Sequence, residues 1–250
     1  MDNFSNTLNL LESLNRTYEI FVPSLNKKVK FKGLTTKQQK DAVKSALEKS
    51  FSGIAFASLL NSILNENSLE KNDYLLTDRS YIIVSLRALS LSPNLKRDDN
   101  SNLDLTPIIS NNVAFPDTLK AQEIVDGNLK LTVSIPKISK DNLINAETKK
   151  KITPLPDDGD MPKEAVGEIF INELVKYIDK LTINNSGTPS EIEFDKLNFN
   201  QKIQILENLP ISINSLLIDY INKVKEEEKK LFTINNQEIN VEVDQTLFTV

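Results

Sequence analysis

The chain has 250 residues, with 30 Lys and Arg against 35 Asp and Glu, which gives a formal net charge of −5. A chain of this length can bury roughly 70–75% of its unfolded surface, so one large domain, with or without a smaller insertion, is expected. No apolar run reaches the roughly 18 residues that a membrane span requires. The first residues also lack the basic and apolar regions of a signal peptide, so neither a membrane span nor Sec-type secretion is expected.

The composition excludes several kinds of catalytic and metal site. The chain has no Cys, no His and no Trp. Thiol nucleophiles, thiolate zinc sites, imidazole ligands and Ser-His-Asp triads are therefore ruled out. The 6 glycines do not occur at the spacing of a phosphate-binding loop. We expect a protein that is not an enzyme and has no cofactor or metal. A hydrolase that works with carboxylates alone is the weakest alternative.

Residues 1–16 are expected to form an N-terminal arm. Leu8, Leu11 and Leu14 recur at a three-residue step between polar residues, which is typical of a short amphipathic helix. Such an apolar stripe can dock on a partner or pack on its own domain, and the pattern leaves both open. We take the three leucines as candidate interface residues.

An alternating pattern then predicts a β-hairpin. Tyr18–Val22 and Lys28–Lys32 flank the turn-forming residues 23–26. The inward side chains are Tyr18, Ile20, Val22, Val29 and Phe31. Lys28, Lys30 and Lys32 point to solvent and are candidate partner contacts. They belong to a lysine-rich stretch, 27–49, whose simplest interpretation is a solvated face.

Three helices follow the hairpin. Thr35 or Thr36 with Gln38 or Gln39 predicts a capping box. The first helix carries Val43, Ala46, Leu47 and Ser50 on one face, and the second carries Phe56, Leu59, Leu60, Ile63 and Leu64. The third runs from about Thr77 to before Pro93 and is apolar nearly all round, which predicts the centre of the core. Arg87 lies on this helix and either anchors groups of its own fold or reaches an interface.

Residues 94–162 change character. Asp126-Gly127 stands between Ile124-Val125 and an alternating stretch that ends at Ile135, which predicts a hairpin. The stretch from Pro136 to Asp160 is interpreted as an exposed linker because it is rich in Pro, Gly and Lys. This interval is expected to be a small β insertion with a flexible exit.

Helical periodicity returns after Pro162. One helix is expected to bury Val166, Phe170, Leu174, Tyr177, Ile178 and Leu181, and a polar loop spans Thr182–Ser190. A short helix covers about 200–208, and a long one buries Ile213, Leu216, Leu217, Tyr220, Ile221 and Val224. A terminal hairpin closes the chain, with Phe248 almost at its end.

The elements together predict an α+β fold: a helical core flanked by N- and C-terminal β-hairpins, with a small β-rich insertion. The expected division is an arm (1–16), a main domain (17–93 and 163–250) and the insertion with its linker (94–162).

Several segments resemble one known family. They are the hairpin and cap from Ile20 to Leu47, the helix end Leu86-Arg87-Ala88-Leu89-Ser90, and the C-terminal stretch Glu207–Val224 with Leu247-Phe248. The chain resembles the baseplate hub and hub-assembly proteins of contractile-tailed phages of the T-even type, over about 18–93 and 163–250. Family members often carry a Cys-x-x-Cys pair after the Leu-Arg-x-x-Ser helix. Residues 94–137 have no Cys, so the resemblance implies no zinc site here.

The resemblance implies a non-enzymatic tail protein, either a hub component or a hub-assembly factor, that acts through protein–protein docking. Its partners would be other baseplate or tail hub proteins, including further copies of itself. It would be found in the virion baseplate or, during assembly, in the host cytoplasm. The candidate interface comprises Leu8, Leu11, Leu14, Lys28, Lys30, Lys32, Arg87 and Phe248. The alternative is nucleic-acid binding by the Lys27–Lys49 face, which is disfavoured because Arg and interleaved aromatic residues are scarce there.

Overall fold

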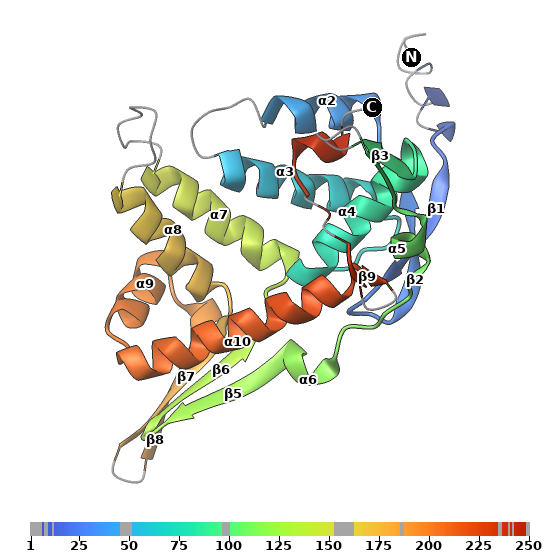
Figure 1. Ribbon diagram of the computed structural model, residues 1–250. Helices are drawn as coiled ribbons and strands as arrows, with labels where there is room; N and C mark the ends of the chain where they lie inside the picture. The colour runs from blue at the N-terminus through green and yellow to red at the C-terminus, as the bar shows by residue number, and fades with distance from the viewer. Residues whose placement is uncertain are drawn as a thin grey trace.

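The computed structural model describes residues 7, 10–11, 13–45, 52–96, 101–152, 163–185, 188–234, 237–239, 241 and 243–248. These residues form an α+β fold, so the predicted fold class is confirmed (Figure 1). Leu8 and the predicted helix positions Ala46, Leu47 and Ser50 lie outside the described residues.

The N-terminal hairpin forms as the alternating sequence predicts. Strands β1 (Thr17–Val22) and β2 (Lys27–Lys32) pair antiparallel, with Tyr18 opposite Phe31 and Ile20 opposite Val29. Its inward-facing apolar residues pack on α4 (Leu76–Ser90) in one hydrophobic cluster. The apolar face is covered, and the opposite face carries the lysines.

Helices α2 (Thr36–Ser45) and α3 (Ser52–Asn67) precede α4. The predicted capping box is confirmed: Thr35 Oγ1 accepts from the Gln38 amide at 3.2 Å, and Gln38 Oε1 accepts from the Thr35 amide at 3.1 Å. The prediction that α4 lies at the centre is also confirmed, since every residue from Tyr81 to Ala88 is buried. Figure 1 shows α4 between α3, the hairpin and α10 (Ile211–Lys230).

A four-stranded antiparallel sheet spans the middle of the chain. Its order is β5-β6-β7-β8, formed by Ala121–Asp126, Leu129–Ser134, Ile178–Asn185 and Thr188–Glu193. The Asp126-Gly127 hairpin is confirmed, and Gly127 has a φ of 56°. Residues from the expected insertion thus share one sheet with residues from the expected main domain. The boundary at 162 does not separate two structural units.

The region after Pro162 differs from the prediction in its second half. Helix α8 (Lys163–Val175) is shorter than expected, because Ile178, Leu181 and the expected loop residues 182–185 belong to β7. The face of α8 is also different, because Val166 and Phe170 are 53% and 51% exposed. The apolar residues predicted to share one helix face therefore belong to two elements, α8 and the strand β7 that follows it.

The expected exposed linker contains a helix, α7 (Ile138–Ile152). Its buried face combines three apolar and three polar residues: Ile138, Asp141, Ile144, Asn145, Thr148 and Ile152. The pattern is helical in spacing, but half of its members are polar, so no apolar stripe marks it. The basic run Lys149–Lys151 occupies the last turn, where cations interact favourably with the helix dipole.

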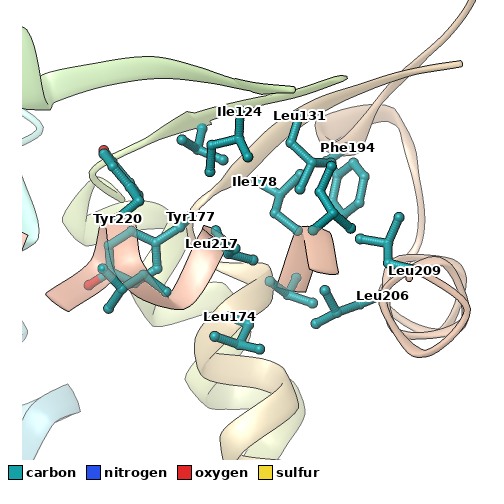
Figure 2. Close-up of a cluster of buried hydrophobic side chains, with 14 of the residues drawn as sticks. Ile124, Leu131, Leu174, Tyr177, Ile178, Phe194, Leu206, Leu209, Leu217 and Tyr220 are labelled. Carbon is teal, nitrogen blue, oxygen red and sulfur yellow. The ribbon is translucent and has the colours of Figure 1, made fainter. Parts of the chain in front are cut away.

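The largest hydrophobic cluster lies between the sheet and three helices: α8, α9 (Phe199–Glu207) and α10. Figure 2 shows Ile124, Leu131 and Ile178 of the sheet pointing toward Leu174, Leu206 and Leu217 of the helices. Of the face predicted for the long helix, only Leu216 is substantially exposed, at 41%. The remaining elements are short: β3 (Asn94–Lys96), β4 (Asn102–Asp104), α5 (Thr106–Ser110), α6 (Asp117–Lys120), η1 (Phe194–Lys196), β9 (Thr233–Ile234), β10 (Gln237–Glu238) and η2 (Gln245–Phe248).

Two further hydrophobic clusters lie around α4. One is formed with α2, α3, α5 and the C-terminal residues, and the other with the N-terminal hairpin. None of the helices in the described part of the chain combines the length and apolar character that crossing a membrane would require.

Candidate functional site

The arm leucines that the structure describes are exposed. Leu10, Leu11 and Leu14 have 65%, 59% and 75% of their surface accessible. The end of the arm is fixed to the hairpin, because Asn15 Nδ2 donates to the Gly33 carbonyl at 2.9 Å and the Gly33 amide donates to the Arg16 carbonyl at 2.8 Å. The arm therefore leaves the body at a defined point and presents apolar side chains there. Leu8 is outside the described residues.

The candidate lysines lie on the outer face of the hairpin. Lys28, Lys30 and Lys32 are exposed and alternate with buried Val29 and Phe31. The neighbouring Lys27 forms an ion pair with Glu70 at 2.9 Å. The three outward lysines thus share one face, as the alternation predicts.

Two candidate interface residues are corrected by the structure, because both are buried in their own fold. Arg87 is 2% exposed, and its guanidinium donates to the carbonyls of Leu247 (2.8 Å), Asn94 (3.0 Å) and Ser92. Phe248 is fully buried and meets the Phe56 ring edge-on at 6.3 Å between centroids. Of the two roles that the sequence left open for Arg87, the structure shows the anchoring of groups in its own fold. Phe248 belongs to the core.

The first turn of α4 carries a polar junction that the sequence analysis did not identify. Three consecutive residues, Asp78, Arg79 and Ser80, reach three separate parts of the molecule. Asp78 accepts hydrogen bonds from the Ser24 amide (2.8 Å), the Ser24 hydroxyl (2.5 Å) and the Leu75 amide (3.1 Å). It ties the turn of the N-terminal hairpin to the start of the central helix.

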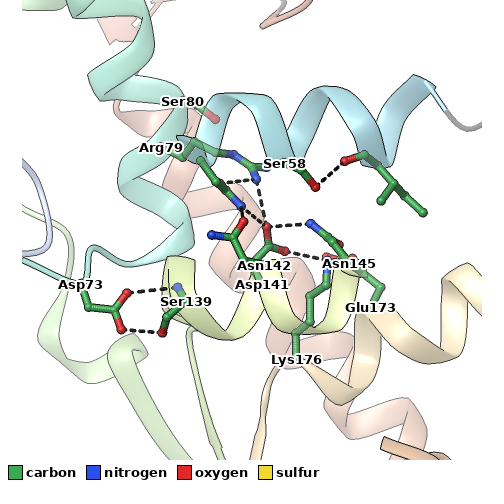
Figure 3. Close-up of polar contacts among 12 residues, drawn as sticks. Ser58, Asp73, Arg79, Ser80, Ser139, Asp141, Asn142, Asn145, Glu173 and Lys176 are labelled. Atoms are coloured by element: carbon green, nitrogen blue, oxygen red, sulfur yellow. Dashed lines mark hydrogen bonds and ion pairs between the residues drawn. The ribbon is translucent and has the colours of Figure 1, made fainter. Parts of the chain in front are cut away.

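Arg79 points to α7, where Asp141 is the centre of a buried ionic cluster (Figure 3). Asp141 lies 2.7 Å from Lys176 Nζ and 3.3 Å from Arg79, and the amide groups of Asn61 (2.7 Å) and Asn145 (3.0 Å) donate to it. Burial alone would raise the pKa of Asp141, but Lys176 and Arg79 outweigh it and hold that pKa below its usual value. The surroundings therefore favour the charged form of this carboxylate.

Ser80 points to α10 and donates to Glu228 at 2.9 Å. Burial raises the pKa of Glu228, and the Ser80 hydrogen bond opposes that rise. Burial likewise raises the pKa of Asp78, to about 6, against the hydrogen bonds from Ser24 and Leu75. The available sequence signal for this junction was Asp78, an acidic residue in the first turn of a mainly apolar helix.

Two shallow cavities lie on the described surface. One of about 440 Å³ is lined by α7 and the start of α9, including Leu143, Glu147 and Phe199. The other, of about 430 Å³, is lined by Glu228, Lys225 and Lys229 with Phe232 and residues of the C-terminal segment. Within the described part of the chain, no group of three or more acidic side chains is placed to hold a metal ion.

Comparisons of the chain with protein-family models, with curated proteins and with solved structures find no match in any of the three.

Proposed function

We propose that the protein is a non-enzymatic component of the tail baseplate of a contractile-tailed phage, acting as a hub component or as a factor that assembles the hub. Two features support this proposal. The segments at about 18–93 and 163–250 resemble hub and hub-assembly proteins, and the described surface offers places for protein–protein docking. The protein would act in the virion baseplate or, during assembly, in the host cytoplasm.

The observation that carries the proposal is the exposed leucine surface of the arm. Isolated exposed apolar residues are common on protein surfaces, but Leu10, Leu11 and Leu14 fall within five positions and are 65%, 59% and 75% exposed. Their exposure favours the docking alternative over packing on the same domain. A partner that covers them gains the free energy of burying apolar surface.

The body behind the arm supports this role through its rigidity. The polar groups at the start of α4 are committed to internal partners, and Arg87 is committed to three backbone carbonyls. A docking protein needs such a framework to hold its contact residues in place before the partner arrives.

Quantitative mass spectrometry of purified particles, beside the lysate that produced them, tests the proposal. A fixed low copy number in the particle identifies a structural baseplate component. Abundance in assembly intermediates with absence from particles identifies an assembly factor. If no tail protein accompanies the chain in either fraction, the proposal is wrong.

A variant then tests the leucine surface itself. Leu10→Ser, Leu11→Ser and Leu14→Ser together should abolish association with tail proteins while leaving the melting temperature unchanged, because these side chains are exposed. The matched control replaces Leu69, Leu143 and Ile211, which are 48%, 70% and 84% exposed on other elements. Equal loss of association in both variants would contradict a specific role for the arm.

A further inference from the structure

The outward lysines of the four-stranded sheet and those of the N-terminal hairpin differ in how their charge is balanced. On the four-stranded sheet the outward charges neutralise each other: Lys130 pairs with Glu123 at 3.0 Å and Lys180 pairs with Glu191 at 3.1 Å. Close to β8, Lys196 also pairs with Glu193 at 2.7 Å. That surface needs no partner to balance its charge.

On the outer face of the N-terminal hairpin the compensation is only partial: Glu70 pairs with Lys27 at 2.9 Å and also interacts electrostatically with Lys30. Within the described part of the chain, Lys28, Lys30 and Lys32 form no ion pair, although each is exposed. Their cross-strand neighbours are Phe21, Glu19 and Thr17, in that order. The face carries a row of cations at steps of about 7 Å, the repeat of every second residue in a strand. Two carboxylates, Glu19 and Glu70, lie beside the row.

This row is continuous with the leucine surface of the arm. Lys32 pairs with Thr17, the first residue of β1, and the arm enters β1 through exposed Arg16. The order along the surface is therefore leucines, Arg16, Lys32, Lys30 and Lys28. Figure 1 shows the hairpin of β1 and β2 along one side of the molecule.

The chemistry of this surface favours a protein partner over a nucleic acid. Three phosphate contacts alone would lose about 40-fold in affinity between 50 and 200 mM salt. Adjoining leucines suit an apolar groove, which a protein surface offers together with carboxylates.

We propose that the arm and hairpin form one composite docking surface for a protein that presents an apolar groove beside a row of Asp or Glu side chains. This inference rests on the proposed docking function and names the chemistry of the partner. The leucines fill the groove, and the lysines fix orientation and speed association through long-range attraction.

Zero-length carbodiimide crosslinking of assembling tails tests the pairing directly, because it joins a lysine only to a carboxylate in contact with it. We expect crosslinks from Lys28, Lys30 and Lys32 to Asp or Glu residues of one tail protein. Crosslinks from these lysines only to Glu19 or Glu70 of the same chain would overturn the inference.

Charge reversal of the lysines provides a second test. K28E/K30E/K32E should weaken association with tail proteins about tenfold, with the loss diminishing as salt is raised. The control K96E/K137E/K223E makes the same change in net charge at exposed lysines on other elements and should leave association unchanged. An equal effect of both variants would overturn the inference.

The outcomes separate this inference from the proposed function. If the leucine variant abolishes association and the lysine variant does not, the docking function stands and the acidic partner surface is excluded. If neither variant has an effect, both proposals fall. If K28E/K30E/K32E abolishes binding to a single-stranded oligonucleotide at physiological salt and leaves association with tail proteins intact, the face binds nucleic acid and the inference is overturned.

Discussion

At the scale of single residues, the buried ionic groups carry the clearest energetic consequences. Asp141 and Lys176 have side chains 1% and 7% exposed and lie 2.7 Å apart. Removing Asp141 alone leaves Lys176 with Glu173 as its remaining ionic partner and leaves Arg79 without this carboxylate. Removing Lys176 as well takes one buried charge out of the cluster, so the second substitution should cost less than it would alone.

Asp141→Leu should therefore lower the free energy of unfolding by about 3 kcal/mol. The double variant Asp141→Leu with Lys176→Met should lose clearly less than the single one. Urea denaturation measures both. A double variant as unstable as the sum of the two single variants would show that the pair is not energetically coupled.

Asp78 gives the stability a dependence on pH. Its pKa is about 6 in the folded protein against an ordinary value of 3.8, because burial disfavours the charged form. Between these values the folded state holds a proton that the unfolded chain has released. The contribution of Asp78 to stability therefore rises as the pH falls from about 6 to about 4.

Asp78→Asn removes this proton uptake. Relative to the variant, the wild-type protein should gain about 2 kcal/mol in unfolding free energy between about pH 7.5 and about pH 4.5. Comparing the two proteins at each pH by urea denaturation cancels the opposite trend from Asp141, whose pKa is lowered. A difference that does not change with pH would contradict the raised pKa.

At the scale of elements, local backbone conformation decides what a substitution does. Gly127 forms the β5–β6 turn with a φ of 56°, a backbone conformation that residues other than glycine rarely adopt. Gly167, in contrast, lies in α8 with open space around it. Helix interiors favour alanine over glycine by about 0.5–1 kcal/mol.

The substitution Gly127→Ala should destabilise the protein by about 1 kcal/mol, and Gly167→Ala should stabilise it by about 0.5 kcal/mol. Guanidinium denaturation of the two matched variants measures the opposite signs. If both substitutions changed the free energy of unfolding in the same direction, the positive φ of Gly127 would not be the cause of its destabilisation.

Arg87, in the last turn of α4, joins this helix to β3 and to the C-terminal turn η2 through its hydrogen bonds. Arg87→Met should cost about 3 kcal/mol, because hydrogen bonds from a charged donor are lost and buried carbonyls are left unpaired. Arg87→Lys should recover part of this stability. Hydrogen exchange should show the larger loss of protection in α4 and β3, and unchanged protection there would contradict the anchoring role.

At the scale of the whole molecule, α10 connects two hydrophobic clusters. Leu217 and Tyr220 belong to the cluster beneath the four-stranded sheet, and Leu231 and Phe232, just after α10, belong to the cluster with α3 and α4. The polar junction at the start of α4 crosses the same boundary. The two clusters are therefore expected to unfold together.

This cooperativity can be measured because the chain has no Trp. Separate variants Phe56→Trp and Phe199→Trp place one fluorescent probe beside each cluster, at partly buried positions. Their urea transitions should coincide at one midpoint. Two separated midpoints would show that each cluster is an independent unit.

The sequence by itself determined the elements whose buried face is apolar and local: the N-terminal hairpin, the capped α2, the helices α3, α4, α9 and α10, and the Asp126-Gly127 turn. Only the tertiary structure decided the others. Residues 138–152 form a helix because Asp141 finds Lys176 and Arg79, which are distant in sequence, and residues 178–185 form a strand because β6 and β8 lie beside them. The burial of Arg87 and Phe248 was settled in the same way. A buried polar face or a central strand is stabilised by partners far along the chain, so no local pattern records it.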